Sequence, residues 1–220
     1  MVSDRETIDA AIHQFVISQN TKDVYYLLFY PCSVILRPLY RLHFRMSQTH
    51  RDKTQIGCGE HYLNGFINID ANFQRRTDYL LDVRAGLPFP DSSMRFIYSC
   101  HMFEHLHVTE AIRLLKECHR VLKTEGYMRL TLPDFEFVFR ILDGDEESSF
   151  PRRFRSRHGQ AINFLFCDGQ HKYGFSKEVV EELALDLGFS KVNDAGPVDR
   201  NISNLANIEP GGSFSVNLYK

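Results

Sequence analysis

The chain has 220 residues, 43% of them hydrophobic, and a formal net charge of −2. This length suits one domain with a substantial core, and the near-neutral charge lacks the strongly basic balance typical of nucleic-acid-binding proteins. The five cysteines are odd in number and form no C-x-x-C pair, which favours a reducing cytoplasm over a disulfide scaffold.

The first 50 residues predict a helical extension in front of a domain that spans 51–220. Residues Met1–Asn20 are polar and acidic, unlike a secretory signal, and the apolar stretch Val24–Leu36 is too short to span a bilayer. Pro38 suits the first turn of a helix. We therefore expect one or two helices over Tyr25–Met46.

Basic residues recur every four positions in this extension, at Arg37, Arg41 and Arg45. We expect the extension to pack on the domain or on a second subunit, as in a homodimer. The alternative is a peripheral contact with anionic lipid at the inner face of the membrane.

The segment Gln55-Ile-Gly-Cys-Gly59 is followed by Gly65-Phe-Ile-Asn-Ile-Asp70. This order predicts a strand, a glycine turn, a second strand and a terminal carboxylate. Glycines allow positive φ and a close backbone approach, and an acidic residue that ends the next strand can accept both hydroxyls of a ribose. The pattern is typical of a nucleotide site.

Further motifs follow in order. Asp78-Tyr-Leu-Leu-Asp82 contains a short strand, and a turn at Leu87-Pro-Phe-Pro-Asp-Ser-Ser93 leads to another strand, Phe96–Ser99. Apolar residues at spacings of three and four predict a helix over Thr109–Lys123. Gly126 is its predicted stop, and the next strand covers Tyr127–Leu132.

These motifs together resemble the class I S-adenosylmethionine-dependent methyltransferases, and among them small bacterial enzymes with G-C-G, F-I-N-I-D, L-P-F-P-D-x-S, E-H-L, E-C-x-R-V-L-K and L-P-D-F. The resemblance is close from Gln55 to Phe135. It implies an α/β Rossmann-like methyltransferase fold, with a mostly parallel sheet, helices on both faces and an abbreviated first crossover.

The resemblance also implies a site for S-adenosylmethionine at the carboxyl ends of the strands. The methionine and ribose portion would lie at Gly57, Cys58 and Gly59, and Asp70 would hold the ribose diol. Asp82 and Val83 would contact the adenine. The methionine arm would lie over the residues that follow the fourth strand, Ser99, Cys100 and His101.

Methyl transfer needs a base only where the acceptor is a poorly acidic hydroxyl. Our candidates are His101 and His171, because histidine titrates near the working pH. Asp134, Phe135 and Tyr173 are candidates for the acceptor pocket.

The spacing of His101 and His105 would place both on one helix face, a geometry that also occurs in metal sites. The sequence signals no third ligand, so we predict no metal.

Two features depart from the wider methyltransferase pattern. Six residues separate Gly59 from Phe66, too few for the usual linking helix, and Lys123-Thr-Glu-Gly126 stands where relatives read Lys-Pro-Gly-Gly. We expect a turn there.

In the last third, an acidic run over Asp143–Glu147 precedes a basic cluster. This pattern indicates a solvated loop or a basic lip for an anionic acceptor. A helix that ends at Gly188 and closing strands at Phe189–Val192 and Ser213–Leu218 are predicted. The cluster consists of Arg152, Arg153, Arg155 and Arg157.

The leading hypothesis is a methyltransferase for a small molecule or saccharide, with O-methylation as the expected reaction. The sugar acceptor follows from the resemblance to enzymes of surface-polysaccharide assembly. The alternatives are a nucleic-acid methyltransferase, which the sequence disfavours, and a degenerate, non-catalytic partner subunit that binds the cofactor.

Overall fold

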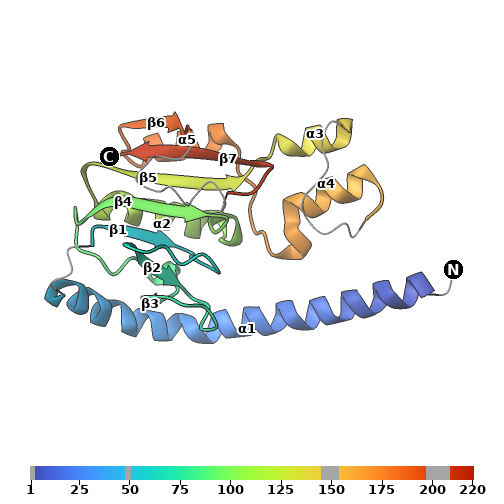
Figure 1. Ribbon diagram of the computed structural model, residues 1–220, viewed down its shortest axis with the longest axis horizontal. Coiled ribbons are helices and arrows are strands. Elements are labelled where there is room, and N and C mark those ends of the chain that lie inside the picture. Colours follow the sequence, from blue (N-terminus) through green and yellow to red (C-terminus); the bar gives the residue numbers. More distant parts are fainter. Residues whose placement is uncertain (1–2, 48–50, 145–153, 197–208) are drawn as a thin grey trace.

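The computed structural model describes residues 3–47, 51–144, 154–196 and 209–220, with side chains from residue 21 onward. These residues form one seven-stranded sheet in the order β3-β2-β1-β4-β5-β7-β6 (Figure 1). Strands β1 to β5 pair in parallel, whereas β7 is antiparallel to both β5 and β6. The strands are β1 (Lys53–Ile56), β2 (Ile67–Asp70), β3 (Tyr79–Leu80), β4 (Met94–Cys100), β5 (Leu122–Pro133), β6 (Lys191–Asp194) and β7 (Ser213–Tyr219).

The main hydrophobic core joins this sheet to three helices. Ile56, Ile97 and Met128 are fully buried in it, together with apolar residues of α2 and α5. The shortness of the segment after β1 leaves a loop over the other side chains of β4, and its Leu63 packs there near Tyr98. The helices are α1 (Ser3–Met46), α2 (Val108–Val121), α3 (Phe137–Asp143), α4 (Arg157–Phe166) and α5 (Lys177–Asp186), with 3-10 turns η1 (Val83–Ala85), η2 (Phe103–His105) and η3 (Cys167–Gly169).

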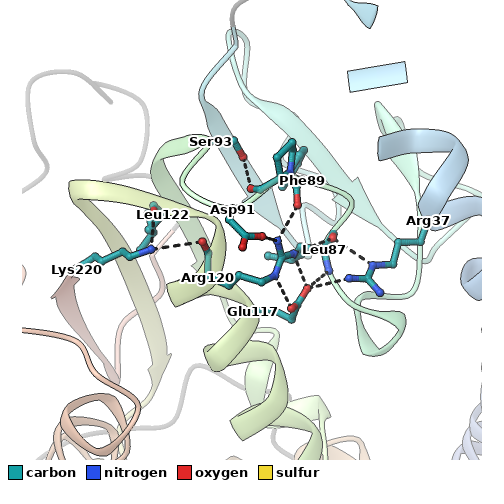
Figure 2. A network of polar contacts seen from close by, with 10 residues as sticks. Arg37, Leu87, Phe89, Asp91, Ser93, Glu117, Arg120, Leu122 and Lys220 are labelled. Atoms are coloured by element: carbon teal, nitrogen blue, oxygen red, sulfur yellow. Dashed lines mark hydrogen bonds and ion pairs between the residues drawn. The ribbon is translucent and has the colours of Figure 1, made fainter. Parts of the chain in front are cut away.

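Two of the sequence motifs hold each other in place (Figure 2). Arg120 of α2 donates to the carbonyl of Phe89 and to Asp91 in the turn before β4, at 3.0 and 2.6 Å. Glu117, one helical turn earlier, accepts from Arg120 and from the backbone N–H of Leu87. The E-C-x-R and L-P-F-P-D motifs therefore have a structural role: their hydrogen bonds hold α2 against the turn before β4.

The N-terminal extension is one continuous helix, α1, and not two. Pro38 lies inside it and not in its first turn, so that prediction was wrong. The inner side packs on the domain as expected: Leu36 and Phe44 contact the main core, and Arg37 donates to the Leu87 carbonyl and to Glu117 (Figure 2). Figure 1 shows the N-terminal part of α1 extending beyond the sheet.

The boundary between α2 and β5 differs from the prediction. The helix ends at Val121 and the strand begins at Leu122, so Gly126 lies within β5 and is no helix stop. The pairing register of β4 and β5 shifts there, and Glu125 has φ +65°. The Lys123–Gly126 segment is therefore a strand irregularity, which accommodates the extra residues without a separate turn.

The closing elements agree with the sequence. Helix α5 precedes Gly188, and β6 and β7 lie within a few residues of the predicted strands. Of the charged clusters, Asp145–Glu147, Arg152 and Arg153 lie outside the described residues. Arg157 donates to the Asp143 carbonyl at 3.2 Å. No described helix has a stretch long and apolar enough to cross a membrane.

Candidate functional site

The candidate site lies where the strand order reverses. The chain leaves β1 toward β2 on one side, while β4 pairs with β1 on the other. In open parallel sheets, ligands bind at this switch point, beyond the carboxyl ends of the strands. Gly57 follows β1, and His101 follows β4, so the topology brings both to this edge.

The glycine turn needs both of its glycines, for different reasons. Gly57 has φ +70°, and an added Cβ would lie 2.4 Å from Met102 Cγ. Gly59 has φ +50°, and no atom of the described residues lies within 4 Å of an added Cβ. The space beside Gly59 is therefore open to a ligand, whereas the space beside Gly57 is filled by the protein.

Asp70 at the end of β2 closes this turn. One carboxylate oxygen accepts from the backbone N–H of Gly59 at 2.8 Å, and the other accepts from Asn72 N–H at 2.8 Å. Each carboxylate oxygen can accept more than one hydrogen bond. The carboxylate is thus held in a fixed orientation and retains acceptor capacity for a diol.

Asp82 is deeply buried and paired within the protein. Its carboxylate accepts from both the side chain and the backbone N–H of Arg84, with the shortest contact at 2.6 Å. Its own N–H donates to Ser33 Oγ of α1 at 2.9 Å. Val83 is also buried. These bonds fix the corner after β3, where we expected the adenine.

Helix α1 contributes residues here that the sequence did not identify. Tyr25 donates to the Ala71 carbonyl at 2.6 Å, directly after Asp70. Burial raises the pKa of Tyr26, and the nearby charges of Asp70 and Asp82 raise it further. A lone serine and a tyrosine pair in an apolar helix were the only signals. The helix therefore borders the corner after β2 and β3.

The side chains of three residues predicted to bind the cofactor serve the protein's own packing. Ser99 is fully buried and donates to the Ile56 carbonyl, which ties β4 to β1. Burial raises the pKa of Cys58 to about 12 and that of Cys100 to about 12. Both sulfurs are therefore neutral thiols at neutral pH, unsuited to nucleophilic attack.

His101 stands at the strand end in the left-handed region, with φ +49°. Its N–H donates to the Thr131 carbonyl, its Nε2 lies 2.7 Å from Ser213 Oγ, and its Nδ1 lies 3.2 Å from Glu104 Oε1. The side chain is 20% exposed, against 2% for Glu104. A buried carboxylate therefore lies beside a partly accessible imidazole.

The expected shared helix face of His101 and His105 is wrong, because His101 precedes η2 and only His105 lies in it. The fold instead brings His105 beside His171, with ring centroids 5.1 Å apart. His171 Nε2 lies 4.0 Å from Glu104 Oε1. The side chain of His171 is 4% exposed, and burial lowers its pKa although Glu104 opposes this.

The predicted acceptor residues lie at the same edge. Asp134 accepts from Glu136 N–H and Arg140 and so holds the turn before α3. Phe135 is 41% exposed and Tyr173 is 38% exposed, and Tyr173 N–H contacts the Glu104 carbonyl at 3.3 Å. The loop before α5 is therefore joined to η2, which follows β4.

A cavity of about 250 Å³ lies between α1, η1 and α2. Its lining includes Val83 and Arg84, but it lacks Gly57, Gly59 and Asp70. We therefore place the candidate site by the strand ends and not by this cavity.

Comparisons with known proteins agree with this architecture. Residues 66–130 match the family described as "Methyltransferase domain". A SAM-dependent methyltransferase from Archaeoglobus fulgidus has a TM-score of 0.51 at 17% identity, covering 89% of this chain and 100% of that one. A SAM-dependent methyltransferase from Thermotoga maritima, a possible histamine N-methyltransferase, has a TM-score of 0.50 at 19% identity, with coverages of 94% and 98%. No curated protein sequence matches the chain. At these identities, the solved structures establish the shared fold, and the predicted fold class is confirmed.

Proposed function

We propose that this protein is an S-adenosylmethionine-dependent methyltransferase that acts on a hydroxyl of a saccharide or another small molecule. The observation that carries the proposal is the turn at the switch point: open space beside Gly59, with Asp70 held against its backbone N–H at 2.8 Å. The family match over residues 66–130 supports the same activity.

The residues present suit the cofactor. Gly57, Cys58 and Gly59 would border its methionine and ribose, and Asp70 would bind the diol. Near the expected adenine position, the Asp82 carboxylate already binds Arg84. We therefore assign the contact with the adenine to the backbone of Val83 and to the side of the Asp82 carboxylate that faces the ligand. Ser99, Cys100 and His101 would border the methionine arm, mainly through their backbone. When bound, the cofactor supplies an activated methyl group.

His101 is the better of the two candidate bases. It is partly exposed at the edge of the sheet, and the Glu104 carboxylate lies 3.2 Å from its Nδ1. Such a carboxylate would stabilise the imidazolium formed when His101 takes the acceptor's proton. The burial of His171 disfavours direct contact with an acceptor.

A saccharide suits the exposed residues at this edge. Phe135 and Tyr173 present apolar ring surface, and Asp134 offers a carboxylate. Rings with nearby polar groups match the alternating apolar and hydroxyl faces of a sugar. The net charge of −2 disfavours a nucleic acid. The intact glycine turn and Asp70 disfavour a degenerate partner subunit.

The first experiment is calorimetric titration of the protein with S-adenosylmethionine and S-adenosylhomocysteine. We expect saturable binding to wild type, and a loss of at least tenfold in affinity for Asp70→Asn, because a diol would lose a charged acceptor. Asp186→Asn, at the exposed end of α5, is the matched control. Folded wild type that binds neither compound would refute the proposal.

The acceptor class is tested next, by transfer of a labelled methyl group to a panel of saccharides, small phenols and RNA. Methyl transfer to a sugar that is lost when His101 is substituted supports the proposal. Transfer only to RNA would refute the assigned acceptor.

We further propose a second copy of this chain as the partner of α1. The outward side of this helix exposes Leu28, Ile35 and Leu42, each by more than half. Arg37, which could have met anionic lipid, is instead turned to Glu117. Of Arg37, Arg41 and Arg45, only Arg45 is exposed, so the apolar face favours another helix over a lipid headgroup layer.

A further inference from the structure

We propose that Glu104, His105 and His171 form a binding site for one divalent first-row transition metal ion. Each offers a ligand atom, and these atoms all lie within 4.8 Å of one another. Sequence spacing alone indicates no third ligand near His105. The fold supplies it by bringing the loop before α5 against η2.

The carboxylate of Glu104 is the observation that calls for a ligand. The residue is 1% exposed, and neither carboxylate oxygen has a hydrogen-bond partner among the described residues. His101 Nδ1 lies 3.2 Å from Oε1 but is not aligned for a hydrogen bond. A buried carboxylate without compensation is costly, and a bound cation would remove that cost.

Both histidines are oriented as metal ligands usually are. His171 Nδ1 lies 2.8 Å from the Leu165 carbonyl, and His105 Nδ1 lies 3.2 Å from the Gln170 carbonyl. A carbonyl can only accept, so each Nδ1 donates its proton to a carbonyl, and Nε2 is the candidate ligand atom of each ring. Ligating histidines typically donate their second N–H to a carbonyl or carboxylate in this way.

The backbone supports the same arrangement. The Glu104 carbonyl accepts from Lys172 N–H at 2.7 Å, directly after His171. Two segments that lie far apart in sequence are thereby joined next to the three ligand atoms. His105 is exposed, so its side chain has room for the small shift that brings the three ligand atoms within reach of one ion. A zinc ion forms bonds of about 2.0–2.2 Å to nitrogen and oxygen ligands, so the three ligand atoms need only move slightly closer together to bind one ion.

Two imidazoles and one carboxylate indicate the class of ion. Imidazole nitrogen suits zinc, iron, nickel or copper, whereas magnesium and calcium prefer oxygen donors. Three protein ligands leave a further position for water or for an oxygen of a substrate. The inference concerns metal binding alone and does not rest on the proposed methyl transfer.

The test uses the full chain, stripped of metal with a chelator and titrated with Zn²⁺ by calorimetry. We expect one ion per chain and a rise in melting temperature on Zn²⁺ addition. His105→Gln should weaken binding at least tenfold and abolish the rise, as should Glu104→Gln. His158→Gln, an exposed histidine of α4, is the control that should leave both unchanged.

Substitution with Co²⁺ adds a spectroscopic readout, because its visible absorption reports nitrogen and oxygen ligands. Absence of one-to-one binding by wild type would overturn the proposal. So would binding that His105→Gln leaves as tight as in wild type. Because His105 is exposed, this variant should fold even where Glu104→Gln does not.

Discussion

At the scale of single residues, the two glycines of the turn after β1 are required for different physical reasons. An added Cβ at Gly57 would overlap Met102, whereas one at Gly59 would meet no atom of the described part of the chain within 4 Å. Both positions have positive φ, so alanine is strained at either.

We predict that Gly57→Ala destabilises the fold by more than about 2 kcal/mol, because it combines strain with a clash. Gly59→Ala should cost only about 1 kcal/mol but should weaken cofactor binding. Urea unfolding measures the first effect and calorimetry the second. Equal stability of the two variants would contradict this division.

Residue chemistry also separates what the sequence could identify from what it could not. The place of Asp70 at the end of β2, beside the glycine turn, was predictable, because it follows from the local pattern of strand and glycine residues. Glu104 was not, because its role depends on His101 and His171, and the latter reaches it only through the fold.

At the scale of elements, α1, α2 and the turn before β4 are joined through one carboxylate. Glu117 accepts from Arg37, Arg120 and the Leu87 N–H. Burial raises the pKa of Glu117, but the hydrogen bonds and charge of Arg120, the Leu87 N–H and the charge of Arg37 outweigh it, so the pKa is lowered.

A lowered pKa in the folded state means that this carboxylate stabilises the fold above its unfolded pKa of about 4.3. That stability is lost as the pH falls through the folded pKa. We predict that Glu117→Gln is less stable than wild type by about 2 kcal/mol at pH 7, and that the gap narrows below about pH 4.

Urea unfolding of both proteins across this pH range measures the gap. Glu181→Gln, on the exposed side of α5, is the control. A gap that stays constant from pH 7 to pH 3 would show that the charge of Glu117 has no part in it.

The sequence predicted the type of each helix and strand more reliably than the residues at which it begins and ends. The apolar spacing in α2 predicted the helix, but its stop was placed at Gly126 although β5 begins at Leu122. Glycine often ends a helix, and here it instead relieves a crowded strand: an added Cβ would lie 2.9 Å from the Lys123 carbonyl oxygen.

At the scale of the whole molecule, the outward side of α1 is the main apolar surface left uncovered in the described part of the chain. Several large apolar residues there are exposed by more than half: Val24, Leu28, Ile35, Leu39, Leu42 and Met46. Soluble monomers rarely expose such a continuous apolar stretch.

We predict a dimer in size-exclusion chromatography with light scattering, and a shift toward monomer for the double variant Ile35→Glu, Leu42→Glu. Each introduced charge would be buried without a partner at a helix–helix contact. Lys22→Glu, an exposed change on the same helix, is the control. Wild type that is monomeric but sediments with anionic vesicles would favour lipid instead.

The sequence by itself determined the order of strands and helices, the glycine turn and Asp70, because these depend on local periodicity, on backbone freedom and on the edge at which parallel strands end. Tertiary structure alone decided that α1 borders the site and that His171 lies beside Glu104 and His105. Those contacts join side chains from segments far apart in the chain, and no local pattern fixes such distances.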